Sequence, residues 1–217
     1  MTVRIKVCCI ANVAEAELAV RHGASALGFV SAMPSGPGPI AEERIAEVAD
    51  HAPPGVATFL LTSRTDAEGI IEQQHRCRCN TLQLVDAVDP RIYPRLRRAM
   101  PGVKIVQVIH VIGNASVGEA LDLAPQVDAL LLDSGNPTLA IKVLGGTGRT
   151  HDWALSRYIV AHAGKPVFLA GGLRPENVVE AIHTVRPYGV DLCNGIRTNG
   201  MLDPEKLEAF VAAVRSA

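Results

Sequence analysis

Eight short apolar runs, each followed by a segment with helical spacing, constrain the fold of this chain more than any other feature. The runs lie at residues 3–10, 26–30, 56–61, 81–85, 103–112, 128–134, 165–172 and 190–195. Continuous apolar runs bounded by Gly, Pro, Asn or Asp are typical of strands that are buried on both faces. The alternation of such strands with helices predicts an α/β protein with a parallel sheet.

The segments between the runs repeat apolar residues at spacings of three and four, as Val13, Ala16, Ala19 and Val20 do, which is typical of amphipathic helices. Eight strand–helix pairs in 217 residues predict a closed (β/α)8 barrel, a TIM barrel, that occupies residues 1–217 as a single domain. An open doubly wound sheet is the main alternative. Its dinucleotide-binding form would place G-x-G-x-x-G after the first strand, where this chain reads "CCIANV".

Helix starts and one loop can also be predicted. "RPEN" at 174–177 and "DPEK" at 203–206 each place a proline at the head of a helix, with an acid in the first turn. We expect Asp203 to be the N-cap of the last helix. "MPSGPGPI" at 33–40 is a turn-rich loop after the second strand, which we expect to form a lid or a rim.

The composition excludes several classes of partner. The formal net charge is -1, so no basic excess attracts nucleic acid or anionic lipid. The opening residues are apolar for only about six positions, too few for a signal peptide or a membrane span, which predicts a soluble, cytoplasmic protein without a membrane partner. The five cysteines are an odd number, which indicates reduced thiols rather than a disulfide framework.

In a barrel of this kind the chemistry takes place at the C-terminal ends of the strands. "GGTGRTHDW" at 145–153 follows the sixth strand, and glycines also end the seventh and eighth. Glycine-rich turns let backbone N–H groups approach an anion, and phosphate sites in this fold lie after strands seven and eight. We therefore expect a phosphorylated small molecule to be bound by Gly146, Thr147, Gly148, Gly171, Gly172, Asn194 and Gly195.

Five segments of the chain match one set of motifs. "IKVCCIANVAEA" is similar to K-I-C-G-I-T, "LLLDS" to an acid-bearing sixth strand, and "GGTGRTHDW" to G-G-T-G-K-T-F-D-W. "AGGLRPENVVEAI" and the later "VDLCNGI" are similar to A-G-G-L-N-P-E-N-V-x-x-A-I and V-D-V-S-S-G-V. These motifs belong to the phosphoribosylanthranilate isomerase family, which the chain resembles from the first strand to the last helix.

The resemblance implies an isomerase of tryptophan biosynthesis that carries out an Amadori rearrangement of N-(5'-phosphoribosyl)anthranilate, an aldose–ketose isomerisation, without metal or organic cofactor. By position, Cys8 matches the general base that removes the sugar C2' proton. Asp133 matches the general acid that protonates the furanose ring oxygen, and Asp191 matches a position near the sugar hydroxyls. Lys6 lies two residues before Cys8 on the same strand face, from where its charge would act on that thiol, and it is also a candidate to contact the substrate.

The chain also departs from the family pattern, mainly around the aromatic half of the substrate. The S-x-R-Y segment, whose arginine grips the anthranilate carboxylate in the family, reads "SGPGP" at 35–39. The histidine of Q-L-H-G is Val85, and the acid of S-S-G-V-E is Arg197. The phosphate half is nearly intact, so the group opposite the phosphate is the open question. His110 and His151 are candidates to contact it.

Other functions stay open at this point. One alternative is a lyase or an epimerase that acts on another phosphate-bearing substrate. Another is a catalytically inactive barrel that binds a phosphorylated metabolite. Zinc would suit Cys8, Cys9 and Cys193, but successive strand residues point to opposite faces, so Cys8 and Cys9 are not expected to share the barrel interior without a bulge. The balanced surface composition is compatible with a monomer or a homodimer.

Overall fold

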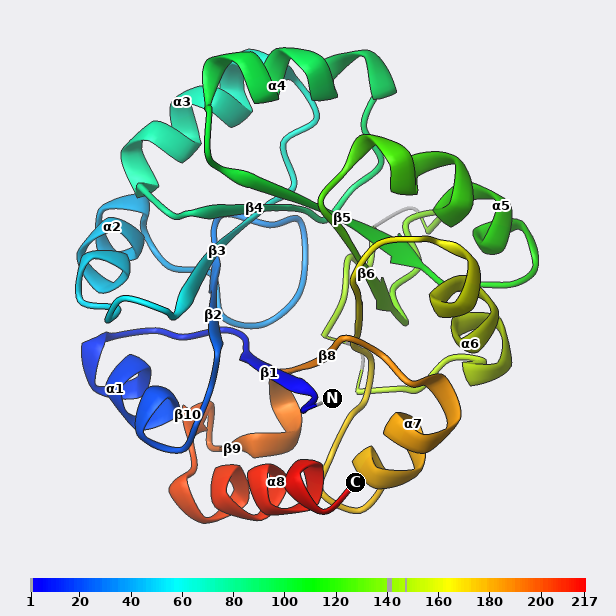
Figure 1. Cartoon of the computed structure of the whole chain (residues 1–217). Coiled ribbons are helices and arrows are strands. Elements are labelled where there is room, and N and C mark those ends of the chain that lie inside the picture. Colours follow the sequence, from blue (N-terminus) through cyan, green and yellow to red (C-terminus); the bar gives the residue numbers. More distant parts are fainter. Residues whose placement is uncertain (1, 140–141, 147) are drawn as a thin grey trace.

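The computed structural model describes residues 2–139, 142–146 and 148–217. Eight parallel strands form a closed barrel in chain order, and β8 pairs with β1 to complete it (Figure 1). The strands are β1 (Arg4–Val7), β2 (Ala26–Val30), β3 (Ala57–Thr62), β4 (Thr81–Leu84), β5 (Lys104–His110), β6 (Ala129–Asp133), β7 (Val167–Leu169) and β8 (Gly189–Leu192). The predicted (β/α)8 barrel is thereby confirmed.

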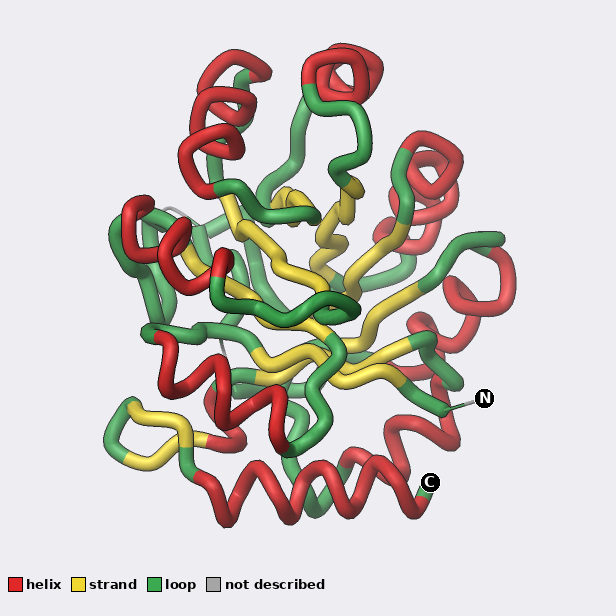
Figure 2. Tube along the Cα trace, turned by 60° about the vertical axis from the view of Figure 1, so that its left-hand side comes forward, coloured by secondary structure: helices red, strands yellow, loops and turns green. Residues whose placement is uncertain are grey.

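Helices surround the strands, which occupy the centre of the molecule (Figure 2). The α-helices are α1 (Val13–Arg21), α2 (Glu42–Asp50), α3 (Ala67–Cys77), α4 (Tyr93–Ala99), α5 (Ala115–Leu123), α6 (Trp153–His162), α7 (Val178–Val185) and α8 (Pro204–Ser216). Short 3-10 turns are η1 (Pro90–Ile92), η2 (Ala124–Gln126) and η3 (Asn194–Ile196), and a small antiparallel pair is β9 (Arg197–Thr198) with β10 (Met201–Leu202). None of the helices in the described part of the chain has the length and apolar content that a membrane span needs.

The predicted helix starts differ in outcome. Asp203 is the N-cap of α8, and its carboxylate accepts hydrogen bonds from the backbone N–H groups of Glu205 and Lys206. The prediction for "RPEN" was wrong, because α7 begins only at Val178. The Asn177 side chain accepts from Arg174 N at 2.9 Å and donates to Gly172 O at 3.0 Å, which ties these residues into a turn before the helix starts.

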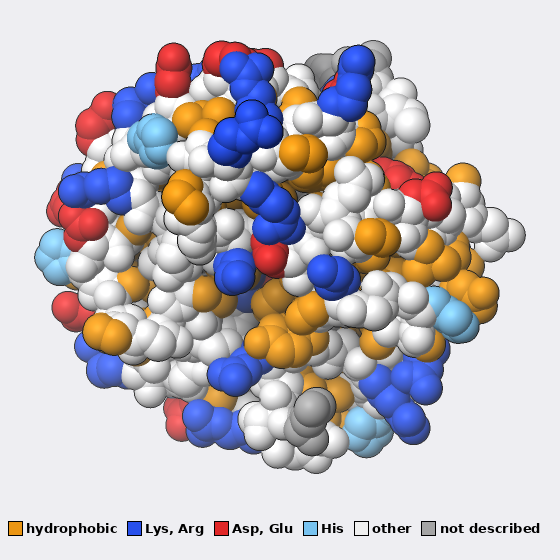
Figure 3. Space-filling view, turned by 45° about the horizontal axis from the view of Figure 1, so that its top comes forward, with side chains coloured by type: hydrophobic (Ala, Val, Ile, Leu, Met, Phe, Trp, Pro, Cys, Tyr) orange, Lys and Arg blue, Asp and Glu red, His pale blue; other side chains and the backbone are white. Residues whose placement is uncertain are grey.

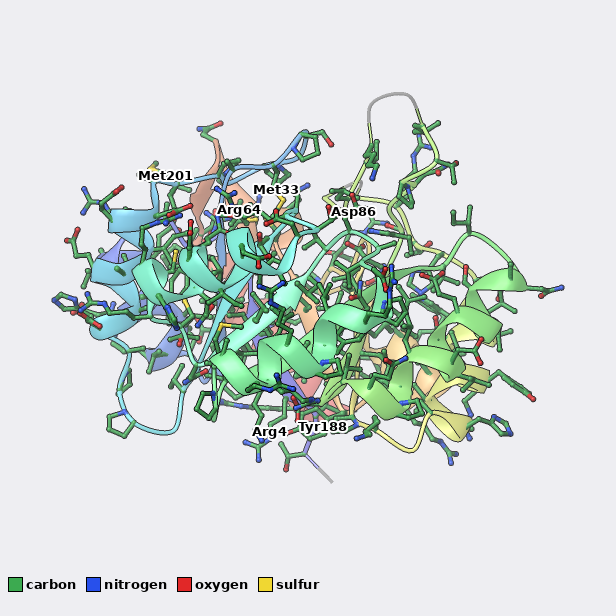
Figure 4. All side chains as sticks on the ribbon, turned by 90° about the horizontal axis from the view of Figure 1, so that it is seen from above. Arg4, Met33, Arg64, Asp86, Tyr188 and Met201 are labelled. Atoms are coloured by element: carbon green, nitrogen blue, oxygen red, sulfur yellow. The ribbon has the colours of Figure 1, made fainter. Side chains whose placement is uncertain are left out.

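Side chains pack on both sides of the strands. The larger apolar cluster lies between strands and helices, and a smaller cluster that includes Phe59, Val108, Leu131 and Phe168 fills the barrel interior. Figure 4 distinguishes the two ends of the barrel: Met33 and Asp86, which follow strands, lie at one end, and Arg4 and Tyr188 lie at the other. On the face in Figure 3, basic, acidic and hydrophobic side chains are interspersed, as the small net charge predicts.

A buried hydrogen-bond network joins α4 to the barrel. Tyr93 Oη donates to Gln107 Oε1 at 2.9 Å, and Gln107 Nε2 lies 3.1 to 3.2 Å from the backbone oxygens of Leu84, Asp86 and Val108. Both side chains are about 1% exposed. A buried amide oxygen that loses its only donor cannot recover the bond from water, so this contact fixes the helix against β4 and β5.

We expect Tyr93→Phe to lower the free energy of unfolding by about 1–3 kcal/mol, because it leaves Gln107 Oε1 buried without a donor. Urea denaturation followed by circular dichroism measures this change. Tyr158→Phe is the matched control, since Tyr158 is 50% exposed and its ring keeps its stacking on His162. Equal stabilities for wild type and Tyr93→Phe would contradict the role of the network.

Candidate active site

A cavity of about 310 Å³ lies at the C-terminal end of the barrel. Residues that follow β1, β6, β7 and β8 form one side of its wall, and the loop after β2 forms another. From that loop, Met33, Ser35, Gly36 and Pro37 line the opening. Ser35 Oγ also donates to Lys142 O at 2.6 Å, which joins the loop to the segment after β6. The loop thus lies at the rim, as predicted.

The glycine-rich segments converge at one end of the cavity. The predicted residues that line it there are Gly146, Gly148, Gly171, Gly172, Asn194 and Gly195. Asn194 Nδ2 donates to Gly146 O at 3.1 Å, which connects the loop after β6 to the turn after β8. Gly172 has a φ of +61°, and a Cβ there would lie 2.7 Å from the backbone carbon of Arg149, so the close approach of these loops requires glycine. Thr147 lies outside the described residues.

Cys8 lies just beyond the end of β1 and lines the cavity. Its backbone N–H donates to Leu192 O at 2.9 Å, which continues the pairing of β1 with β8. An alanine Cβ at Gly28 would lie 3.0 Å from Cys8 Sγ and 2.9 Å from Lys6 Nζ. The thiol and the ammonium group therefore adjoin the same small space inside the barrel.

Lys6 does not line the cavity but lies beneath it, fully buried. Its Nζ is 2.8 Å from Asp191 Oδ1, and Asp191 does line the cavity. Burial alone would lower the pKa of Lys6, but the Asp191 carboxylate, through its charge and its hydrogen bond, raises it above its ordinary value. Lys6 is therefore a permanent positive charge under the cavity floor.

Asp133 ends β6 and faces the cavity from a strand that is not a neighbour of β1. Its Oδ1 accepts from Ser134 N at 2.7 Å. A Cβ at Gly145 would lie 2.5 Å from Asp133 Oδ2, so glycine at this position leaves the second carboxylate oxygen room beside the loop. Cys8 and Asp133 thus border one cavity from different strands. The glycine-rich segments after β7 and β8 lie between them along the wall.

The opposite end of the cavity is apolar, a feature that the sequence reasoning missed. Its wall consists of Val30, Met33, Leu61, Val85, Val108 and Leu144. Gln83 also lines the cavity, is 3% exposed, and its Oε1 has no hydrogen-bond partner among the described residues. An apolar wall with one unpaired acceptor suits a planar ring that carries an N–H donor. The alternation of strand residues was the signal that could have assigned these side chains to the interior.

Neither candidate histidine belongs to the cavity wall. His110 Nε2 bonds to Val85 O at 2.9 Å, and its Nδ1 lies under Gly135. His151 Nε2 bonds to Ser156 Oγ at 2.7 Å, and burial lowers the pKa of its imidazole. One nitrogen of each ring is thus held by a group of the protein, whereas Nδ1 of each ring has no hydrogen-bond partner among the described residues.

Cys9 overturns one expectation from the strand pattern. It lines the cavity together with Cys8, although they are consecutive residues. The strand ends at Val7, and Cys9 has a φ of +62°, so the two side chains do not alternate as they would within a strand. Cys193 lines the same end of the cavity. No group of three or more Cys, His, Asp or Glu side chains in the described part of the chain is arranged to hold a metal ion.

Arg197 holds the backbone at the two cysteines. Its Nη2 donates to Cys8 O at 3.2 Å and to Cys9 O at 2.6 Å, and its Nη1 donates to Glu15 Oε1 at 2.9 Å. Glu15 Oε2 accepts from Ala11 N at 3.0 Å and so anchors the start of α1 to the same group. Arg197 stands where the family motif has an acid, and it therefore has a structural partner in Glu15 of α1.

The buried ion pair generates a stability prediction. We expect Lys6→Met to destabilise the protein by about 3–5 kcal/mol, since it leaves the Asp191 carboxylate buried without its partner. The double variant Lys6→Met/Asp191→Leu should recover most of this loss, and urea denaturation measures both. Lys104→Met is the control, because Lys104 and Asp128 form an exposed pair at 3.9 Å. A double variant no more stable than Lys6→Met would disprove the interpretation.

Comparisons with known proteins identify the family. The family model for N-(5'-phosphoribosyl)anthranilate isomerase matches residues 5–213. The chain is 38% identical to N-(5'-phosphoribosyl)anthranilate isomerase 2 of Methanosarcina mazei, with 96% of this chain and 92% of the relative covered. It is 37% identical to the Haloferax volcanii enzyme, with 99% and 94% covered.

Solved structures agree with this result. The phosphoribosyl anthranilate isomerase of Thermotoga maritima superposes with a TM-score of 0.85 at 27% identity, and 99% of this chain and 100% of the other are covered. A phosphoribosyl anthranilate isomerase in complex with reduced 1-(o-carboxyphenylamino)-1-deoxyribulose 5-phosphate superposes with a TM-score of 0.82 at 25% identity, with the same coverage. The chain belongs to the phosphoribosylanthranilate isomerase family.

Proposed function

We propose that this protein isomerises N-(5'-phosphoribosyl)anthranilate to 1-(o-carboxyphenylamino)-1-deoxyribulose 5-phosphate, with Cys8 as the general base and Asp133 as the general acid. The observation that carries the proposal is the placement of both side chains on one cavity whose glycine-rich end and apolar end match the two halves of this substrate. The family match over residues 5–213 supports the reaction type.

The proposed reaction moves two protons. Asp133 donates a proton to the furanose ring oxygen, the bond from C1' to that oxygen breaks, and the positive charge passes to the anthranilate nitrogen. The Cys8 thiolate then takes the proton from C2', and the electron pair left on C2' neutralises the iminium group. The resulting enol tautomerises to the ketone, so no oxidant or cofactor enters the balance.

The glycine-rich end is the proposed phosphate site. Backbone N–H groups near Gly146, Gly172 and Gly195 provide donors that a dianion needs, and the loops are held together by Asn194. Among the described residues of the wall, Arg174 is the cation, and it lies next to Leu173 at this end. We propose that Arg174 supplies charge to the phosphate, where the family motif has asparagine.

The apolar end is the proposed site of the anthranilate ring. Met33, Leu61 and Val108 provide a dry surface for it. We propose that Gln83 Oε1, which is buried without a partner among the described residues, accepts the N–H of the aniline nitrogen. The loop at 35–39 supplies no arginine for the carboxylate. We propose that this carboxylate points toward the mouth of the cavity, where water solvates it.

We also propose that the protein is cytoplasmic and that it is a monomer or a homodimer. All five cysteines are free thiols, which supports a reducing compartment such as the cytoplasm. The ligand is a small molecule, and the dispersed charges give no support for binding to nucleic acid. A monomer or a homodimer fits the proposal, and light scattering during gel filtration separates the two.

Turnover tests the chemistry. We expect purified protein to consume N-(5'-phosphoribosyl)anthranilate, measured as loss of its fluorescence, and Cys8→Ser and Asp133→Asn to lower kcat by at least about 10²-fold each. Binding of the reduced product analogue, measured by calorimetry, should persist in both variants, because the phosphate and ring sites are unchanged. Cys77→Ala is the control, since Cys77 is buried outside the cavity. Absence of turnover by the wild type at high enzyme concentration would refute the proposed substrate.

Arg197 provides a second test as a positioning residue. We expect Arg197→Met to lower kcat by about 10- to 100-fold with little change in KM, because the Cys8 and Cys9 carbonyls lose their donor and the base shifts while the phosphate loops stay in place. Arg197→Lys should restore part of kcat, since an ammonium group can still reach Glu15 or one carbonyl. A rise in KM at constant kcat would assign Arg197 to substrate binding instead.

A further inference from the structure

Three thiols meet at the glycine-rich end of the cavity, and the proposed isomerisation uses only one of them. Cys8, Cys9 and Cys193 all line the wall there. The β1–β8 pairing places Val7 beside Leu192, so the residues that follow these two partners are adjacent at the barrel seam. The Cys9 thiol donates to Pro37 O at 3.7 Å and the Cys193 thiol to Asn194 Oδ1 at 3.5 Å, and the two thiols lie close enough to influence each other's pKa. Cys9 and Cys193 therefore form a close pair that the reaction leaves unexplained.

The two thiols differ in access and in charge. Cys193 is half-buried and opens to the cavity, whereas the loop after β2 covers Cys9: a Cβ at Gly38 would lie 2.6 Å from Cys9 Cβ. The hydrogen bond from Cys9 and the guanidinium of Arg197 lower the pKa of Cys193, while hydrogen bonds with Cys193 and Cys8 and burial raise that of Cys9. An accessible thiol with a lowered pKa next to a covered thiol with a raised pKa is the arrangement of an attacking and a resolving cysteine.

We propose that Cys9 and Cys193 form a reversible disulfide when the protein meets a peroxide, and that this bond switches off the site. The Cys193 thiolate attacks one peroxide oxygen, the O–O bond breaks, and the hydroxide that leaves takes up a proton to become water. The Cys9 thiol then attacks Sγ of the Cys193 sulfenic acid, the S–O bond breaks, and the hydroxyl leaves as water with the Cys9 proton. Two electrons pass from the two sulfurs to the peroxide.

The bond would act on the site through its neighbours. Cys193 directly precedes Asn194, which holds Gly146, and Cys9 directly follows Cys8. Drawing the two sulfurs together shifts both the glycine-rich end and the backbone that carries the proposed base. A displacement of about 1 Å at such positions lowers turnover by about 10²-fold. The inference depends on the proposed function for this effect on activity only, because the crosslink itself forms without turnover.

Peptide mapping after mild treatment with hydrogen peroxide tests the bond directly. Trypsin releases residues 7–21, with Cys8 and Cys9, and residues 158–197, with Cys193, because Lys165, Arg174 and Arg186 each precede a proline. We expect these two peptides to be joined in the wild type and in Cys8→Ser, and to be separate in Cys9→Gly and Cys193→Ser. Glycine at position 9 suits the φ of +62° and is the residue of the family motif, so this variant keeps the fold.

Activity provides the second readout. We expect peroxide to lower wild-type turnover by about tenfold or more, with full recovery in dithiothreitol, and the Cys77→Ala control to behave like the wild type. A crosslink that persists in Cys9→Gly and disappears in Cys8→Ser would assign the bond to Cys8 and overturn the proposal. Oxidation of Cys193 to sulfinic acid without any crosslink would overturn it as well. A wild type that forms the crosslink but never consumes the substrate would instead refute the proposed function alone.

Discussion

Closure of the barrel by the pairing of β1 with β8 is the constraint on which the rest of the site depends. The register of this seam sets Lys6 beside Asp191 and Val7 beside Leu192. A buried ammonium and a buried carboxylate are tolerated because the seam presents them to each other at 2.8 Å. The same register brings the ends of the first and last strands together, so the residues that follow them, Cys8 and Cys193, share one wall of the cavity.

Two backbone features at the rim of the cavity depart from regular structure. Cys9 adopts a left-handed conformation, and the Gly172 backbone passes so close to Arg149 that no side chain fits. Arg197 stabilises the first of these departures by donating to the Cys8 and Cys9 carbonyls, and Glu15 compensates its charge. Strain at the rim is thus offset by charge-assisted hydrogen bonds on the far side of the backbone.

Much of the fold could be predicted from the sequence, because buried parallel strands have a strong signal. Each of the eight apolar runs overlaps a strand, and Asp203 caps α8 as its sequence context indicates. The start of α7 was missed because a side-chain turn at Asn177 competes with the helix signal of Pro175. The sequence pattern alone does not show whether the side-chain hydrogen bonds of the turn or those of the helix are stronger.

For the site, the sequence predicted which residues gather but not how each one is oriented. Cys8, Asp133 and the described glycines of the phosphate loops lie on one cavity, as expected from strand ends. The sequence could not place His110 and His151, whose rings turn to Val85 O and Ser156 Oγ, because rotamers are set by neighbours from other elements. Nor could it show that Cys9 leaves the strand alternation, since a positive φ in a residue other than glycine has little sequence signal.

The aromatic rings at the other end of the barrel bear on how ligands come and go. Phe59 meets Phe168 edge-to-face at 5.9 Å, Phe168 meets Tyr188 at 5.3 Å, and Lys6 Nζ lies 5.2 Å from the Phe59 ring. Phe59, Phe168 and Lys6 are buried and fill the interior below the cavity, whereas Tyr188 is half-exposed at the far end of the barrel, so a ligand reaches the cavity through the rim. Substrate and product must share that passage, and an accumulating product would therefore compete with fresh substrate for entry.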